Sequence, residues 1–230
     1  MKLYHGTSEQ NFREIMSQGR LKPRRDSKKD NWDTTIKSRN DMVYLTNAYG
    51  LYYAINAISE TDWDNMNSKP TYAVILEIDT NALDQRLLCA DGDALEQIKR
   101  HDKNELPGSW SIARRKIYYQ EMCHKYRWDQ SIQTTGLCAY LGTIKREAFS
   151  RVAMINVRAQ SELCFQAFDM TIDARKYSGI EGVKYRTLSR WIFGDSPLES
   201  DKKFLADMSI NAKRDGIEII NLRARERAIA

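Results

Sequence analysis

The chain has 230 residues, of which 42% are hydrophobic and 29% are charged, and its formal net charge is +5. This balance is typical of a soluble globular protein and excludes a disordered or fibrous chain. The length favours a single domain, 1–230, around one sizeable core. No apolar run approaches the length of a membrane span, and the first residues lack the apolar stretch of a signal peptide. We therefore expect a cytoplasmic protein without a membrane partner.

The first third of the chain predicts alternating strands and helices. A short strand is expected over 2–5, followed by a helix that ends at Gly19, a residue that commonly terminates helices. Thr7 and Gln10 have the spacing of a capping box, which predicts Thr7 as the N-cap of that helix. Three further elements follow from their apolar and aromatic residues: a strand over 42–46, a helix over 49–59 and a buried strand over 71–79.

The remainder of the chain is predicted with less regular patterns. Residues 80–150 read as a mainly helical insertion that the rest of the fold does not explain, with helices over 93–99 and 112–128. The later elements are strands over 151–157, 162–172 and 216–222 and a helix over 198–213. Strands and helices in this mixture predict an α+β fold.

The positive charge is concentrated in one segment. Between Arg20 and Arg39 there are eight basic and three acidic residues, which leaves 28 residues of each sign in the rest of the chain. The segment has a single aromatic residue, Trp32, and no apolar period, so we expect a surface loop. Such a loop either aids solubility or attracts phosphates, because clustered cations steer polyanions.

Metal and disulfide chemistry have little support. The four cysteines lie far apart without a C-x-x-C pair, and the three histidines, His5, His101 and His124, are isolated in sequence. Zinc sites and secreted disulfide frameworks have closer and more regular spacings. The cysteines therefore resemble neither a zinc site nor a secreted disulfide framework, and we expect no metal.

Three segments combine residues suited to binding a nucleotide. His5-Gly6-Thr7 lies where a strand turns into a helix, a place where backbone N–H groups are exposed to a ligand. Tyr44 lies in the strand over 42–46, and Tyr52 and Tyr53 follow on a helix. Glu162 begins an otherwise apolar predicted strand, where a carboxylate is costly unless it is exposed or used. Each segment also has a structural explanation: a helix cap, aromatic core residues and an exposed strand-end Glu.

The order of these segments resembles the ADP-ribosyltransferase superfamily, in particular its His-Tyr-Glu branch, which includes diphtheria toxin and the poly(ADP-ribose) polymerases. His5-Gly6-Thr7, Val43-Tyr44-Leu45-Thr46 and Ser161-Glu162-Leu163 match its three motifs. The resemblance implies a split mixed β-sheet core with flanking helices, and NAD as co-substrate without a metal.

The resemblance also implies roles for individual residues. His5 would hydrogen-bond a ribose hydroxyl of NAD, and the Gly6-Thr7 turn would hold the nicotinamide carboxamide through the Gly6 backbone. Tyr44 would stack on the nicotinamide ring, with Tyr53 or Tyr52 as a second wall. Glu162 would accept a hydrogen bond from the ribose 2′-hydroxyl and stabilise the cationic transition state, which is the electrostatic task that glycosidic cleavage requires.

Acceptor contacts are expected at the basic loop and before Glu162. Arg24, Arg25, Lys28 and Lys29 occupy the place of the family's donor loop and would contact a phosphate of NAD or of the acceptor. Gln160 lies in the predicted target-recognition turn. Together with Trp32, Trp110 and Trp128, which could stack on bases, these residues favour a nucleic-acid acceptor, although a basic loop also suits an acidic protein.

A stand-alone transferase of this size resembles the toxins of bacterial toxin–antitoxin and phage-defence systems, with an antitoxin as a further partner. We expect mono-ADP-ribosylation. Three alternatives stay open: an NAD-using RNA 2′-phosphotransferase, an inactive NAD- or ADP-ribose-binding module, and an unrelated α+β domain in which the three motifs are coincidental.

Overall fold

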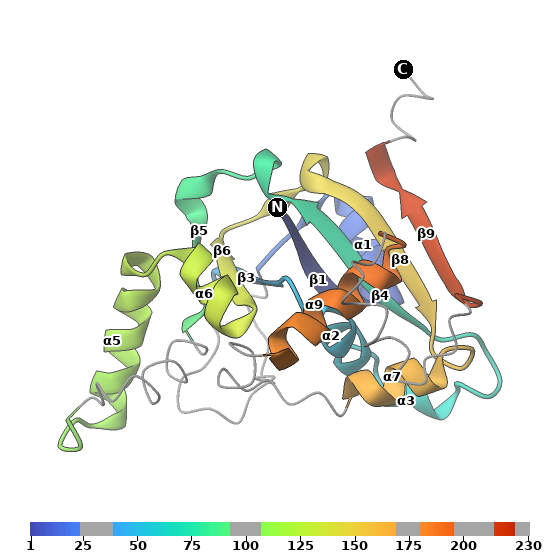
Figure 1. Cartoon of the computed structure of the whole chain (residues 1–230), viewed down its shortest axis with the longest axis horizontal. Coiled ribbons are helices and arrows are strands. Elements are labelled where there is room, and N and C mark those ends of the chain that lie inside the picture. The colour runs from blue at the N-terminus through green and yellow to red at the C-terminus, as the bar shows by residue number, and fades with distance from the viewer. Residues whose placement is uncertain (24–38, 93–106, 169–179, 196–213, 224–230) are drawn as a thin grey trace.

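The computed structural model describes residues 1–23, 39–92, 107–168, 180–195 and 214–223 (Figure 1). A seven-stranded sheet with the order β5-β6-β3-β1-β4-β8-β9 forms its centre, and every neighbouring pair is antiparallel. Its strands are β1 (Lys2–Ser8), β3 (Met42–Thr46), β4 (Tyr72–Asp79), β5 (Leu88–Ala90), β6 (Leu137–Leu141), β8 (Phe149–Asn156) and β9 (Ile217–Asn221). A separate two-stranded sheet joins β2 (Arg20–Leu21) to β7 (Ile144–Lys145).

Helices cover both faces of the large sheet. They are α1 (Glu9–Gln18), α2 (Gly50–Asn56), α3 (Glu60–Asp64), α5 (Ile112–Lys125), α6 (Trp128–Thr135), α7 (Ser161–Phe168) and α9 (Ile180–Ile192). Short 3₁₀ turns are η1 (Thr80–Ala82), η2 (Gln85–Leu87) and η3 (Arg146–Ala148). The coarse prediction of an α+β fold is thus confirmed. No helix of the described residues is long and apolar enough to cross a bilayer.

The central strand β4 is buried on both faces, which explains its continuous apolar sequence. Successive side chains of a strand point to opposite faces. Val74 therefore joins the core that contains Ile15 of α1, whereas Ile75 joins the core that contains residues of α2, α7 and α9. The helix α5 lies at the β5 end of the sheet, away from β9 (Figure 1).

The first helix begins and ends as its sequence suggests, with one difference at its start. The N-cap is Ser8, whose hydroxyl accepts a hydrogen bond from the Asn11 amide at 3.3 Å, so the prediction of Thr7 as the cap was wrong. Thr7 itself is buried within β1. Gly19 ends the helix at φ 65°, a left-handed conformation that glycine adopts without strain.

The predicted strand over 162–172 is wrong in its described part, because Ser161–Phe168 forms the helix α7. Leu163, Cys164 and Ala167 are buried while Phe165 is 68% exposed, a spacing that fits one face of a helix. The strands expected over 42–46, 71–79, 151–157 and 216–222 are confirmed as β3, β4, β8 and β9. The helices expected over 93–99 and 198–213 lie outside the described residues.

The segment 80–150 contributes to the sheet as well as to the helices. Its strands β5 and β6 extend the sheet beyond β3, and α5 and α6 pack beside them. Residues of this segment therefore help to build the surroundings of Tyr44, which lies opposite Ala139 of β6.

Candidate functional site

His5 and Tyr44 meet where the sheet is most weakly joined among its described strands. β1 pairs with β4 over seven residues and β3 pairs with β6 over five, but β1 pairs with β3 only through Tyr4 and Thr46. One position beyond that pair, the Nδ1 atom of His5 lies 3.1 Å from the Tyr44 carbonyl oxygen. A side-chain contact thus links the two strands where their ladder ends.

This contact fixes the chemistry of the imidazole. A carbonyl oxygen only accepts hydrogen bonds, so Nδ1 carries the proton and Nε2 of the neutral ring is an acceptor. Burial lowers the pKa of His5, and its hydrogen bond to the Tyr44 carbonyl opposes that shift only in part. The ring is therefore neutral at pH 7. Within the described residues the Tyr44 carbonyl is its one hydrogen-bond partner, so Nε2 can accept a hydroxyl proton from a ligand.

The Tyr44 side chain is held at both its ring and its hydroxyl. The half-buried ring packs on a cluster that includes Met42, Cys89 and Ala139. The hydroxyl accepts a hydrogen bond from the Arg39 amide at 2.6 Å. Because Thr46 lies opposite Tyr4, Tyr44 leaves the same face as Tyr4, and His5 leaves the other. The two side chains therefore lie on opposite faces of the sheet, and only the Tyr44 backbone contacts His5 directly.

Gly6 is required by the helix that packs over it. A Cβ atom at this position would lie 2.2 Å from the Gly50 carbonyl oxygen and 2.4 Å from the Ala54 amide nitrogen of α2. It would also lie 2.8 Å from the Cβ of Tyr53. The close approach of α2 thus accounts for the glycine, whether or not its backbone binds a ligand.

Tyr52 and Tyr53 lie beside this contact. Their rings are 5.5 Å apart and nearly perpendicular, and both pack partly buried against a small core of Ala48, Tyr49 and Leu137. An edge-to-face arrangement of this kind stabilises aromatic packing. Tyr53 therefore packs next to Gly6, the residue that follows His5.

Glu162 and Gln160 have different surroundings. Glu162 is exposed in the first turn of α7, where a carboxylate is favourable beside the helix N-terminus. No contact among the described residues brings it to His5 or Tyr44. Gln160 is buried, and its side-chain amide donates to the Asp215 carbonyl at 2.6 Å, which ties the turn before α7 to the chain before β9. Arg24, Arg25, Lys28 and Lys29 lie outside the described residues.

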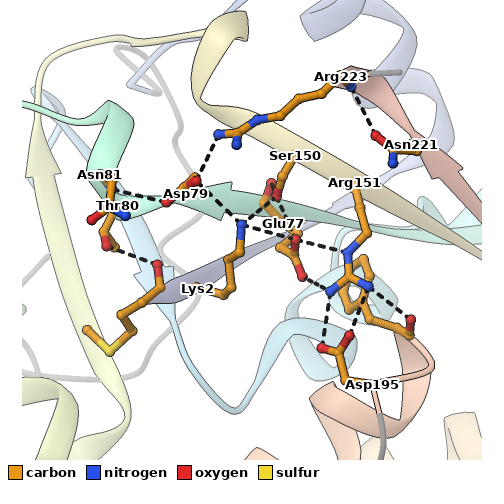
Figure 2. A network of polar contacts seen from close by, with 12 residues as sticks. Lys2, Glu77, Asp79, Thr80, Asn81, Ser150, Arg151, Asp195, Asn221 and Arg223 are labelled. Carbon is orange, nitrogen blue, oxygen red and sulfur yellow. Dashed lines mark hydrogen bonds and ion pairs between the residues drawn. The ribbon is translucent and has the colours of Figure 1, made fainter. Parts of the chain in front are cut away.

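A buried ionic network that no sequence motif indicates lies on β4 and β8, with Glu77 opposite Tyr4 (Figure 2). Glu77 of β4 is 1% exposed and forms a two-pronged ion pair with Arg151 of β8. Ser150 donates to the same carboxylate at 2.5 Å, and Arg151 also binds Asp195 at 2.9 Å. Glu77 and Arg151 are 74 residues apart and meet only through the register of β4 and β8, so the pair leaves no local pattern in the sequence.

This network fastens the end of α9 to the sheet beside β1. Arg151 donates to the Phe193 carbonyl at 3.2 Å, and its guanidinium lies 5.0 Å from the Phe193 ring centre. Tyr4 stacks on the same ring at 5.3 Å, and burial followed by the charge of Glu77 raises the pKa of its hydroxyl. Glu77, Arg151 and Asp195 are all paired, so the network anchors Tyr4, the residue before His5, rather than providing a reactive group.

No group of three or more His, Cys, Asp or Glu side chains in the described part of the chain could hold a metal ion. Comparisons with protein-family models, curated proteins and solved structures found no match.

Proposed function

We propose that the protein is an NAD-dependent mono-ADP-ribosyltransferase that modifies a macromolecular acceptor, with nucleic acid favoured over protein. The observation that carries the proposal is the contact of the His5 ring with the Tyr44 carbonyl, beside the single residue pair that joins β1 to β3. These are the two residues to which the family resemblance assigns the nicotinamide riboside half of NAD. The two residues are neighbours across β1 and β3, although their side chains leave opposite faces of the sheet.

The chemistry of the two side chains suits that half of NAD. The Nε2 atom of a neutral His5 can accept a hydrogen bond from a ribose hydroxyl. The Tyr44 ring offers an aromatic surface, and its hydroxyl is already engaged by the Arg39 amide, which holds the ring in place. Nicotinamide would leave as a neutral molecule, and the step involves no redox change. Positive charge develops on the ribose, so a carboxylate near it would stabilise the transition state.

Glu162 is our candidate for that carboxylate, by resemblance alone. Its position on the exposed start of α7 gives a specific reason to consider a second function, a module that binds NAD or ADP-ribose without cleaving it. The two functions differ in one measurable product, because only the transferase releases nicotinamide.

The deciding experiment measures binding and turnover separately. NAD binding is followed by calorimetry, and nicotinamide release and label transfer are followed with labelled NAD and RNA, single-stranded DNA or a cell lysate. We expect Tyr44→Ala and His5→Ala to weaken binding at least tenfold. We expect Glu162→Gln to abolish transfer with little change in binding, while Glu218→Gln, a matched exposed acid on β9, leaves both unchanged.

Each outcome has a distinct meaning. Label on nucleic acid that is lost in Glu162→Gln supports the transferase, and label on protein alone overturns the favoured acceptor. Binding without nicotinamide release supports the binding module. Transfer that survives Glu162→Gln removes this residue from the mechanism, and absence of NAD binding refutes both functions.

A further inference from the structure

Two of the four cysteines meet in the core beside Tyr44. Cys89 of β5 and Cys123 of α5 are 3% and 1% exposed and belong to the same apolar cluster as Met42 and Ala139. The Cys89 thiol donates to the Ala139 carbonyl at 3.6 Å, and Cys89 and Cys123 lie close enough for each thiol to shift the pKa of the other. The remaining cysteines, Cys138 and Cys164, pack in two other clusters.

The cluster also contains a cation directed at one of the two sulfurs. The Nη1 atom of Arg39 donates to the Cys123 sulfur at 3.5 Å, while the rest of the guanidinium is held by Asp41 at 2.8 and 2.5 Å. The neighbouring Cys89 thiol and then the charge of Arg39 lower the pKa of the Cys123 thiol, against the effect of burial. A thiol with a cation and a second thiol against it has the surroundings of a redox-active cysteine with its resolving partner.

We propose that Cys123 and Cys89 form a reversible disulfide when the protein meets a peroxide. The Cys123 thiolate attacks one oxygen of hydrogen peroxide, the O–O bond breaks, and hydroxide leaves and takes up a proton to become water. The Cys89 sulfur then attacks the resulting sulfenic acid, the S–O bond breaks, and a second water is released with the Cys89 proton. Two thiols are oxidised and one peroxide is reduced. Because both sulfurs are buried, the oxidant has to be small.

The disulfide would reach Tyr44 through Arg39. The same residue whose guanidinium contacts the Cys123 sulfur donates its backbone N–H to the Tyr44 hydroxyl at 2.6 Å. Oxidation turns the thiol that Arg39 contacts into a disulfide sulfur and so changes the anchoring of the residue that holds Tyr44. We expect the oxidised protein to bind NAD less tightly, and this expectation rests on the proposed function. The formation of the disulfide is independent of that function.

The experiment oxidises the reduced full-length chain with hydrogen peroxide, blocks the remaining thiols after unfolding and maps tryptic peptides by mass. The four cysteines fall in different tryptic peptides, with Cys89 in 87–99 and Cys123 in 117–125. We expect these two peptides to be joined, with loss of two hydrogen atoms, and to separate again after dithiothreitol. Cys138 and Cys164 should stay blocked as thiols.

Variants complete the design. Cys123→Ala should lose the cross-link, and Cys164→Ala, a matched buried cysteine from another cluster, should retain it. Three results would overturn the proposal. They are four unchanged thiols after oxidation, further oxidation of Cys123 without a cross-link, and a cross-link to another cysteine. In the second arm, we expect several-fold weaker NAD binding after oxidation, reversed by dithiothreitol. Equal affinity of the two forms would refute the link to Tyr44, while absence of NAD binding in both would refute the proposed function and leave the disulfide result intact.

Discussion

Replacing Gly6 by alanine should be among the most damaging small substitutions in the described part of the chain. The added Cβ would lie 2.2 and 2.4 Å from two backbone atoms of α2, which have no rotamer to escape into. The helix would have to move outward although Leu51, Ala54 and Ile55 are buried against the sheet. Overpacking of a well-filled core costs about 1–3 kcal/mol and occasionally more, and contact with backbone places this site at the upper end, near about 3 kcal/mol. Such a loss lowers the ratio of folded to unfolded protein by roughly a hundredfold.

Urea unfolding measures this loss, and two other glycines give graded controls. At Gly50 the nearest atoms to a new Cβ belong to side chains, at 3.0 and 3.2 Å, and alanine favours the helix, so we expect a small net change. At Gly108 no atom lies within 4 Å, and the change in stability should stay within about 0.5 kcal/mol. A Gly6→Ala protein as stable as Gly108→Ala would refute the reasoning that α2 dictates this glycine.

Three further predictions concern stability. Arg151→Met removes the two-pronged partner of the buried Glu77 carboxylate and leaves it Ser150 and a partly exposed Lys2 at 3.7 Å, so it should cost about 3 kcal/mol in urea unfolding. Arg86→Met, which breaks an exposed pair, should cost less than about 1 kcal/mol, and equal losses would contradict the difference in burial. Ser8→Ala removes the α1 cap and should cost about 1 kcal/mol in the same assay. The lowered pKa of His5 means that the unfolded chain takes up a proton more readily, so its contribution to stability is present above about pH 6.5 and is lost as the pH falls below it. The difference in unfolding free energy between wild type and His5→Asn should therefore shrink from pH 8 to pH 5, and a constant difference would count against the shift.

The elements predicted well are those whose own residues carry a pattern. β4 was predictable because its run of apolar residues is buried on both faces, and α1 because a polar cap precedes a helical period that ends at Gly19. β5 and β6 were missed because three and five residues without alternation have no local signature. They become strands only by pairing with each other and with β3.

The error at Glu162 has a physical cause. Leu163, Cys164 and Phe165 form a short apolar run, and such a run fits a buried strand or a helix equally well in sequence. Packing against α2 decided in favour of the helix and left Phe165 exposed, which a central strand would not have done. The carboxylate therefore starts a helix, and its predicted catalytic role no longer has a strand to support it.

The candidate site could be named from sequence only as separate motifs, because its geometry depends on the order of the strands. That order divides the large sheet into two ladders, β5-β6-β3 and β1-β4-β8-β9, which the Tyr4–Thr46 pair and the His5–Tyr44 contact join. On one side, the Thr46 hydroxyl donates to the Gly136 carbonyl at 2.7 Å and so binds β3 to the start of β6. On the other, Arg151 and Phe193 hold Tyr4 and the end of α9. Each ladder has many internal contacts, whereas one residue pair and the His5–Tyr44 hydrogen bond join the two ladders. A shift of β3 would therefore change the position of His5 before that of other β1 residues.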